Sequence, residues 1–375
     1  MRVKNKSFNW VEKTAPYVLL TPLLFMLIVF FGFAFVRCLY FSFTNYDFFN
    51  PAKWVGFHNY LNLLTNARFG FALKNTLLFA ATVTILQTCL ALVLALFLNQ
   101  KLRGIKYFRA IYYAPSVASS VVVTLIFTWI FQRKGLLNYL ATLLAQNSPL
   151  ILTFVLIMLI CQTFLVLKEK WRKRPVSVLE PSFLAISLLI SGFITFVLYK
   201  TEIIMPVTFF QPVETIWLNT RELWPKWLGP FAVARPLISI MMLNVWTTGP
   251  TFMLLYLAGL QEVPKELYEV SAVDGANGWH TYRYIIIPQL RNVTFLVVTM
   301  GLISTLQMFD QVAIVGTDMA PENSIITLAY FVYTNVFPPS AIPRVGMASA
   351  AAIFLSVLTL VIVLIQQKII KRGSD

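Results

Sequence analysis

Long apolar runs separated by short polar segments organise the whole chain. A helix needs about 20 predominantly apolar residues to cross a hydrocarbon core roughly 30 Å thick. We predict six main spans, at about residues 17–41, 71–98, 110–131, 236–260, 292–315 and 342–366. Two further runs, at 150–167 and 182–199, lie near the lower length limit. The pattern predicts an all-α fold, a polytopic transmembrane helix bundle of about eight helices.

The two shorter runs form an extra hairpin inside an inserted region, residues 132–215, of a single membrane domain that covers residues 1–375. Five cations and one anion lie between these runs, at 168–174. Cytoplasmic loops carry an excess of Lys and Arg, so the tip of the hairpin is predicted to be cytoplasmic. A short apolar stretch at 325–336 indicates a partial or interfacial helix.

Basic residues also gather at residues 1–16, 99–109 and 368–372. The same charge rule places both termini in the cytoplasm. The polar segment 263–288 has no clear positive excess, so its predicted cytoplasmic side follows from the even number of preceding spans.

Composition narrows the classes of protein that fit. The 375 residues are 58% hydrophobic and 12% charged, which excludes an ordinary soluble globular protein. The net charge of +15 would suggest nucleic acid in a soluble domain, but here the cations lie in short loops and account for orientation in a lipid membrane. We therefore expect no nucleic-acid partner.

Few residues could support catalysis or metal binding. Three cysteines lie far apart in apolar runs, and there are only two histidines, so we expect neither a metal site nor a catalytic residue. The chain has no GxxxxGK[ST] signature, so it does not itself carry that ATP site.

The polar segment 263–288 stands out between apolar runs. Pro264 suits the first turn of a helix, and Gly275 can adopt the left-handed conformation that ends one. Asn277 can cap a second short helix, which Pro288 is expected to stop or kink.

Helical spacing sorts the first of these helices into two faces. One face carries Val263, Leu267, Val270 and Val273, and the other carries Lys265, Glu269, Ala272 and Ala276. A carboxylate beside small side chains suits docking to a partner with a cation. From the pattern alone, an amphipathic helix that lies on its own protein fits equally well.

These residues resemble the EAA signature of permease subunits of binding-protein-dependent ABC importers. The resemblance is carried by Glu269-Val270-Ser271, Asp274-Gly275-Ala276 and Ile285-Ile286-Ile287-Pro288. Trp246, Gly249, Leu257-Ala258-Gly259-Leu260-Gln261, Pro264 and Glu266-Leu267-Tyr268 are similar to the carbohydrate branch, which includes maltose-type and glycerol-3-phosphate-type permeases. Pro115, the Arg103-Gly104 turn, Gln307, Phe309 and Asp310 also fit this branch. Val270 and Ser271 depart from the alanines of the signature.

The resemblance implies a six-span permease core in a bacterial inner membrane, so the hairpin at 150–199 is extra. It implies pairing with a second homologous permease, expected to be a different gene product, docking to ABC ATPase subunits that use ATP, and cargo delivery by an external solute-binding protein. No cofactor is expected in this chain. The implied ATPase-coupling residues are Glu269, Ser271, Ala272, Asp274, Gly275, Ala276 and Pro288.

Alignment with maltose-type permeases through Pro288 also implies a cargo pathway. The matching positions are Thr247, Thr248, Thr251, Gly301, Ser304, Thr305 and Met308. None is charged, which suits a neutral sugar or polyol, although Thr and Ser also pack membrane helices against one another. Asn244 and Gln307 are candidates by polarity. Asp310, near the outer end of its span, could be structural, contact the binding protein or touch cargo.

Two other classes of protein fit the pattern less well. A secondary transporter driven by an ion gradient needs ionisable groups or broken helices at mid-membrane, and the predicted spans carry very few charges. A membrane enzyme needs paired carboxylates, histidine clusters or an activated nucleophile, and the pattern shows none. The cargo stays open among maltose-like oligosaccharides, glycerol phosphates or phosphodiesters, and compatible-solute glycosides.

Overall fold

The computed structural model describes residues 8–100, 104–172, 181–207 and 211–372. The cations at Arg2, Lys4, Lys6, Lys101, Arg103, Lys173 and Arg174, which support the predicted topology, lie outside these ranges. The chain divides into two compact units: residues 1–125 with 219–375, and residues 126–218. We call them the core unit and the insert unit.

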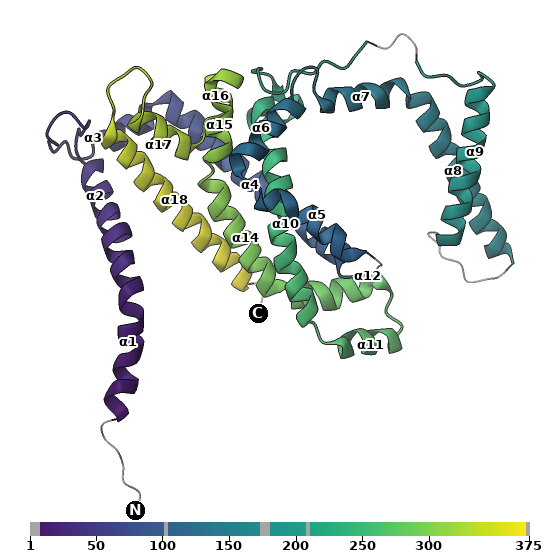
Figure 1. The fold of residues 1–375 in the computed structure, drawn as a ribbon, viewed down its shortest axis with the longest axis horizontal. Coiled ribbons are helices and arrows are strands. Elements are labelled where there is room, and N and C mark those ends of the chain that lie inside the picture. Colours follow the sequence, from purple (N-terminus) through teal and green to yellow (C-terminus); the bar gives the residue numbers. More distant parts are fainter. Residues whose placement is uncertain (1–7, 101–103, 173–180, 208–210, 373–375) are drawn as a thin grey trace, which may run out of the picture. The chain divides into compact units, whose positions relative to one another are not determined.

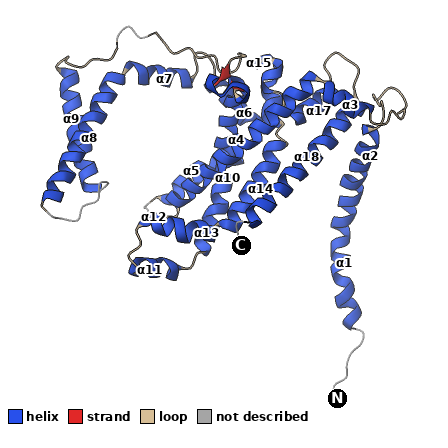
Figure 2. Cartoon of the chain, turned by 180° about the vertical axis from the view of Figure 1, so that it is seen from behind, coloured by secondary structure: helices blue, strands red, loops and turns tan. Residues whose placement is uncertain are grey.

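The core unit is almost entirely helical (Figures 1 and 2). Its first half contains α1 (Phe8–Met26), a π-helical segment (Leu27–Gly32), α2 (Phe33–Ser42), α3 (His58–Thr65), α4 (Ala67–Leu98), α5 (Ile105–Val117) and the start of α6 (Ser120–Ile130). Its second half contains α10 (Arg235–Glu262), α11 (Lys265–Val273), α12 (Gly278–Thr281), a π-helical segment (Tyr282–Ile286), α13 (Ile287–Gln289), α14 (Arg291–Leu306), α15 (Asp310–Met319), α16 (Glu322–Ile325), α17 (Leu328–Val336) and α18 (Val345–Arg372). Strands β1 (Leu223–Trp224) and β2 (Val233–Ala234) pair antiparallel around a short 3-10 helix (Lys226–Phe231).

The all-α, multi-span prediction is confirmed. Within the described ranges, seven helices are long and apolar enough to cross a membrane, and the number rises to eight if one bent pair counts as a span. They are Thr14–Ser42, Ala67–Leu98, Ser148–Trp171, Ser182–Lys200, Arg235–Glu262, Arg291–Gly316 and Val345–Ile369, with the pair Ile105–Val117 and Ser120–Ile130. The stretch predicted as a partial helix, 325–336, contains the last residue of α16 and the whole of α17.

The third predicted span is not continuous, which corrects the single helix expected at 110–131. Helices α5 and α6 meet at an angle of 99°. Pro115 lies in the last turn of α5, where its ring removes a backbone donor. Ala118 then takes an extended conformation that ends the helix. Hydropathy missed this break because the residues on both sides of it are apolar.

The fifth predicted span, at 292–315, is also interrupted. Helix α14 ends at Leu306, and α15 begins only at Asp310. Within α15, Gly316 leaves the helical region with a φ of +56°. The interruption exposes the side chain of Gln307 at the end of α14.

Helix α4 is the centre of the core unit, because it packs against both α10 and α14. Two clusters of buried apolar side chains fill these contacts, one including Phe79, Val83 and Leu237 and the other including Ala91, Met253 and Tyr256. Polar groups join the same helices: the Thr84 and Thr305 hydroxyls lie 3.2 Å apart, and the Thr248 hydroxyl donates to Gln87 Oε1 at 2.7 Å. Helix α18 packs against α2 and α17.

The insert unit contains α7 (Leu136–Gln146), α8 (Ser148–Trp171) and α9 (Pro181–Lys200). Helices α8 and α9 pack side by side, and the buried Ser187 hydroxyl donates to Gln162 Oε1 at 2.9 Å. Asn138, in α7, bonds to residues on both sides of the hairpin: its amide donates to the Arg133 and Thr215 carbonyls, and its Oδ1 accepts from the Trp217 indole N–H. These bonds tie both ends of the insert unit together.

Candidate functional site

Helix α11 and the turn after it have the local geometry that the sequence predicts. Gly275 has a φ of +73°, a conformation that a side chain would strain. The Ala276 N–H donates to the Ser271 carbonyl and the Gly275 N–H to the Ala272 carbonyl, the paired bonds of a glycine-ended helix. Asp274 is the exposed residue between helix and turn. Asn277 Oδ1 accepts from the His280 N–H at 2.9 Å and caps α12.

Two prolines lie close to helix ends in this loop. Pro264 occupies the position just before the first turn of α11, instead of lying inside the turn. Pro288 lies one residue before the end of its helix, because α12 runs on through the π-helical segment into α13, which ends at Gln289. A proline has no N–H and its ring crowds the carbonyl four residues before it, so a wider π-helical turn just ahead of Pro288 accommodates the ring.

The faces of α11 are rotated from the predicted ones. Val263 and Ser271 are buried, whereas Val270 is 57% and Val273 is 89% exposed. The Ser271 hydroxyl lies 3.4 Å from the Thr281 hydroxyl, so contact with α12 buries the serine side. Val263, Leu267, Val270 and Val273, which helical spacing groups on one face, therefore differ in burial: the first is buried, the second half-buried and the last two exposed. The exposed side combines two valines with Glu269 and Ala272, which argues against a helix lying on its own protein.

Burial raises the pKa of the Tyr268 phenol above its ordinary value of 10, so this side chain carries no charge near pH 7. The charge that α11 presents comes instead from Lys265, Glu266 and Glu269, all exposed. Helices α11 and α12 lie at the same end of the core unit as the C-terminal end of α18, with α3 and α16 at the opposite end (Figures 1 and 2). The helix is thus an exposed acidic and apolar surface at one end of the bundle.

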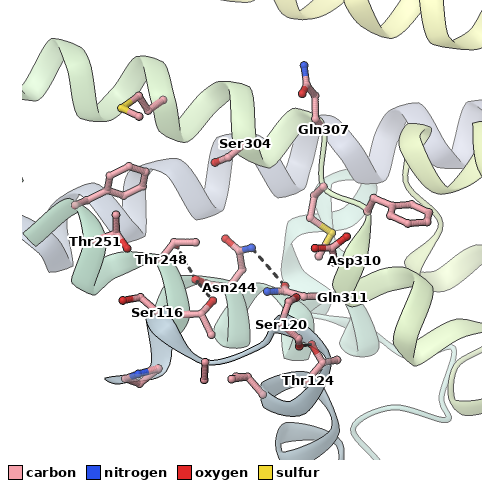
Figure 3. Close-up of a pocket in the computed structure, with 18 residues that line it drawn as sticks. Ser116, Ser120, Thr124, Asn244, Thr248, Thr251, Ser304, Gln307, Asp310 and Gln311 are labelled. Carbon is pink, nitrogen blue, oxygen red and sulfur yellow. Dashed lines mark hydrogen bonds between the residues drawn. The ribbon is translucent and has the colours of Figure 1, made fainter. Parts of the chain in front are cut away.

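A cavity of about 460 Å³ lies where the two interrupted spans meet α10 (Figure 3). The break between α5 and α6 forms one wall, α10 forms the second, and the end of α14 with the start of α15 forms the third. Its lining residues are Pro115, Ser116, Ala118, Ser120, Val123, Thr124, Asn244, Thr247, Thr248, Thr251, Phe252, Met300, Ser304, Gln307, Met308, Phe309, Asp310 and Gln311.

Five of the seven residues implied for a cargo pathway line this cavity: Thr247, Thr248, Thr251, Ser304 and Met308. Gly301 and Thr305 do not. Thr305 is buried and bonded to Thr84, and a Cβ on Gly301 would lie 2.6 Å from Gln87 Nε2. These two positions are therefore used for close packing of α14 on α4. Asn244, Gln307 and Asp310, singled out by polarity or charge, all line the cavity.

The cavity wall formed by α5 and α6 was not predicted from the sequence. Ser116, Ser120 and Thr124 lie there, and Gln311 joins them from α15. The available signal was the polar interruption Pro115-Ser116 followed by Ser119-Ser120 in an otherwise apolar run. Broken helices at membrane depth are tolerated where they line a cavity.

Hydrogen bonds orient most of the polar groups around the cavity. The Thr248 hydroxyl lies 2.7 Å from both Gln87 Oε1 and the Asn244 carbonyl, which share its one proton. The Asn244 amide donates to Gln311 Oε1 at 3.4 Å (Figure 3). Asn244 Oδ1, on a side chain that is only 9% exposed, has no hydrogen-bond partner in the described structure. Asp310 is the one ionisable side chain among the lining residues.

Among the described residues there is no group of three or more His, Cys, Asp or Glu side chains that could hold a metal ion.

Comparison with known families gives a direct match. Residues 87–374 match the family described as the binding-protein-dependent transport system inner membrane component. This match gives no support to the alternative of an ion-gradient carrier.

Three named bacterial or archaeal permease proteins are similar over nearly the whole chain. The multiple sugar-binding transport system permease protein MsmF of Streptococcus mutans is 27% identical over 99% of this chain and 98% of its own length. The trehalose/maltose transport system permease protein MalF of Thermococcus litoralis is 24% identical over 98% of both chains. The probable ABC transporter permease protein YurN of Bacillus subtilis is 25% identical over 97% of this chain and 98% of its own.

One solved structure shares the fold. A chain of a bacterial ABC transporter involved in the import of the acidic polysaccharide alginate matches with a TM-score of 0.64 and 19% identity, over 99% of this chain and all of that chain. A second structure shows the bacterial alginate transporter in complex with a periplasmic protein that holds an alginate pentasaccharide, with a TM-score of 0.62.

Proposed function

Because this chain belongs to the family of inner membrane components of binding-protein-dependent transport systems, it is a multi-pass permease subunit of an ABC importer, and we propose that its cavity belongs to the pathway of a sugar, oligosaccharide, polyol or related solute. The observation that supports this assignment is the cavity at the two interrupted spans, lined by hydroxyl and amide groups. Polar groups at membrane depth are costly unless they are used. The names of the sugar permeases that it resembles support a saccharide cargo.

The loop containing α11, residues 263–288, is proposed to be the surface that couples the permease to ABC ATPase subunits. Glu269 would pair with a basic residue of the ATPase, while Val270 and Val273 fill an apolar part of its docking cleft. Their exposure at one end of the bundle supports this role. ATP is bound and hydrolysed in the partner, so this chain needs no cofactor of its own.

The coupling is a two-state process. Closure of the ATPase subunits on ATP would move α11 and α12 together, because the bond of Asn277 to the His280 backbone and the contact of Ser271 with Thr281 hold the loop together. The movement would switch the cavity between its two accessible sides. A ligand can bias such an equilibrium only if it binds one state more tightly, and here that ligand is ATP on the neighbouring subunit.

The external partner is a solute-binding protein, as the family description requires. A second homologous permease is proposed to complete the pathway, as a heterodimer with this chain. The loop 263–288 and both termini would then lie in the cytoplasm, with the membrane being a bacterial inner membrane. Residues 132–215 are proposed to be an insertion that adds two crossings to a six-span core and so leaves the orientation unchanged.

The test uses Glu269→Ala and Gly275→Pro in the assembled importer. Both are expected to abolish uptake and the stimulation of ATP hydrolysis, while the variants still insert into the membrane. Gly278→Pro is the matched control, since Gly278 is the first residue of α12 after an extended Asn277, a position that proline fits. Normal uptake by either of the first two variants would contradict the coupling role.

A further inference from the structure

The hydroxyl groups around the cavity are set up to accept hydrogen bonds. Five of the seven lining hydroxyls donate their proton to a carbonyl nearby in their own helix, at 2.7–3.1 Å, and so offer their free lone pairs to a ligand. The donors are Ser116 to Tyr113, Thr124 to Ser120, Thr247 to Leu243 and Asn244, Thr248 to Asn244, and Ser304 to Gly301. A ligand in the cavity therefore meets hydrogen-bond acceptors at these five hydroxyl groups.

The amide pair strengthens this polarity. Asn244 directs its N–H toward Gln311 and so leaves its Oδ1 as an acceptor with no partner in the described structure. A buried oxygen without a partner is costly, and since this atom has almost no accessible surface, it adds a negative partial charge beside the cavity instead of a contact to a ligand. Side-chain donors are also present around the cavity: the amides of Asn244, Gln307 and Gln311 carry N–H groups, and the Ser120 and Thr251 hydroxyls can donate.

The charge of the lining residues also favours a ligand that donates hydrogen bonds. Asp310 is the one ionisable group among the lining residues, it is exposed, and an ionised carboxylate only accepts. No lysine, arginine or histidine occurs among the lining residues that the structure describes. An anionic cargo would meet repulsion from Asp310 with no cation to offset it, whereas a neutral polyol or an amino sugar would find acceptors for its O–H and N–H groups.

We propose that this cavity admits neutral and cationic saccharides and excludes anionic ones, and that Asp310 is the residue that enforces the exclusion. The inference rests on the proposed function, because it specifies the cargo class of the same pathway. It concerns the permease itself, as a filter that acts after the external binding protein has released its cargo.

The experiment measures saccharide binding to the purified full-length chain in lipid nanodiscs by saturation-transfer NMR. The probes are neutral glucose, maltose and cellobiose, each paired with the analogue in which one CH₂OH group is oxidised to a carboxylate, and glucosamine as the cation. We expect the uronates to bind at least about tenfold more weakly than their neutral counterparts, a difference of about 1.4 kcal/mol. Asp310→Asn should narrow this ratio to about threefold or less and weaken glucosamine binding, whereas Asp310→Glu should preserve the ratio.

The outcomes separate the two proposals. Equal binding of uronates and neutral sugars by the unmodified chain, or an unchanged ratio in Asp310→Asn, would overturn the charge filter and leave the saccharide pathway standing. No binding of any neutral probe would overturn both. If Asp310→Asn does not fold, the ratio of neutral-sugar affinity to uronate affinity is measured on the unmodified chain at increasing salt concentration. Electrostatic exclusion must weaken as the ionic strength rises, so a ratio independent of salt would overturn the proposal.

Discussion

Helices α8 and α10 are similar in length but differ in what surrounds them. The most apolar window of α8 has a mean hydropathy of 2.8 and is 11% buried, whereas that of α10 has a mean hydropathy of 1.3 and is 50% buried. The less hydrophobic helix is thus the one enclosed by protein. Lipid accepts only apolar side chains at low cost, so polar residues move to helices that can pair them or that line a cavity.

The difference extends to the units that contain these helices. In the core unit, α4, α10 and α14 are joined by small residues and polar contacts such as Gln87 with Thr248. In the insert unit, α8 and α9 leave most of their large apolar side chains exposed, as in Leu152, Ile160 and Leu189. The first pattern is typical of helices that line a pathway and the second of a hairpin that faces lipid, and three predictions test the distinction.

The largest effect is expected from changing the number of crossings. Removing α9 alone should invert everything after it, so that Ala272→Cys, in a chain whose three native cysteines are replaced, reacts with an impermeant thiol reagent added outside intact cells. Removing residues 148–200 as a whole should leave Ala272→Cys protected, because an even number of spans is lost. Position 272 is used because Ala272 is exposed, whereas Ser271 is buried. Protection in both deletions would mean that the hairpin does not cross the membrane.

A smaller effect is expected from enlarging a glycine in each unit. Gly301→Leu forces a side chain against Gln87, since a Cβ there would lie 2.6 Å from its Nε2, whereas a Cβ on Gly192 meets nothing closer than 3.9 Å, at Phe154. We expect Gly301→Leu to lower the free energy of unfolding by about 1–3 kcal/mol and to reduce uptake. The matched change Gly192→Leu should stay within about 0.5 kcal/mol.

Denaturant unfolding of the purified chain gives the free energies, and uptake in vesicles gives the activity. Equal destabilisation by Gly301→Leu and Gly192→Leu would show that the two helix pairs are packed alike. The contrast between core and hairpin would then be wrong.

The smallest effect is expected from removing one interhelical polar contact in each unit. Double-mutant cycles on Thr84 with Thr305, and on Gln162 with Ser187, should each give a coupling free energy of about 0.6 kcal/mol and at most about 1.7 kcal/mol. The contacts are of similar type, at 3.2 and 2.9 Å. Uptake should fall only for the first pair, because it holds α14 against α4 behind the cavity. A fall in uptake for Gln162→Leu would assign the hairpin a part in transport.

The sequence alone predicted features that depend on local chemistry. Backbone groups in lipid must be satisfied inside a helix, so the lengths of the apolar runs were enough to place the crossing segments, although not the breaks in the third and fifth of them. Gly275 and Asn277 were predictable because a left-handed turn and a helix cap depend on a few neighbouring residues. The cavity residues Thr247, Thr248, Thr251, Ser304 and Met308 came from a resemblance that preserves spacing along the chain.

Only the tertiary structure decided which way side chains face. The sequence spacing treats Gly301 and Ser304 alike, but α4 covers the first and leaves the second at the cavity. It treats Val270 and Val263 alike, but contact of Ser271 with α12 turns the first outward. The bend between α5 and α6 was hidden because an average over hydropathy does not register a single proline. The side to which a side chain faces and the bend of a membrane span depend on contacts between segments far apart in sequence. Those contacts exist only in the folded chain.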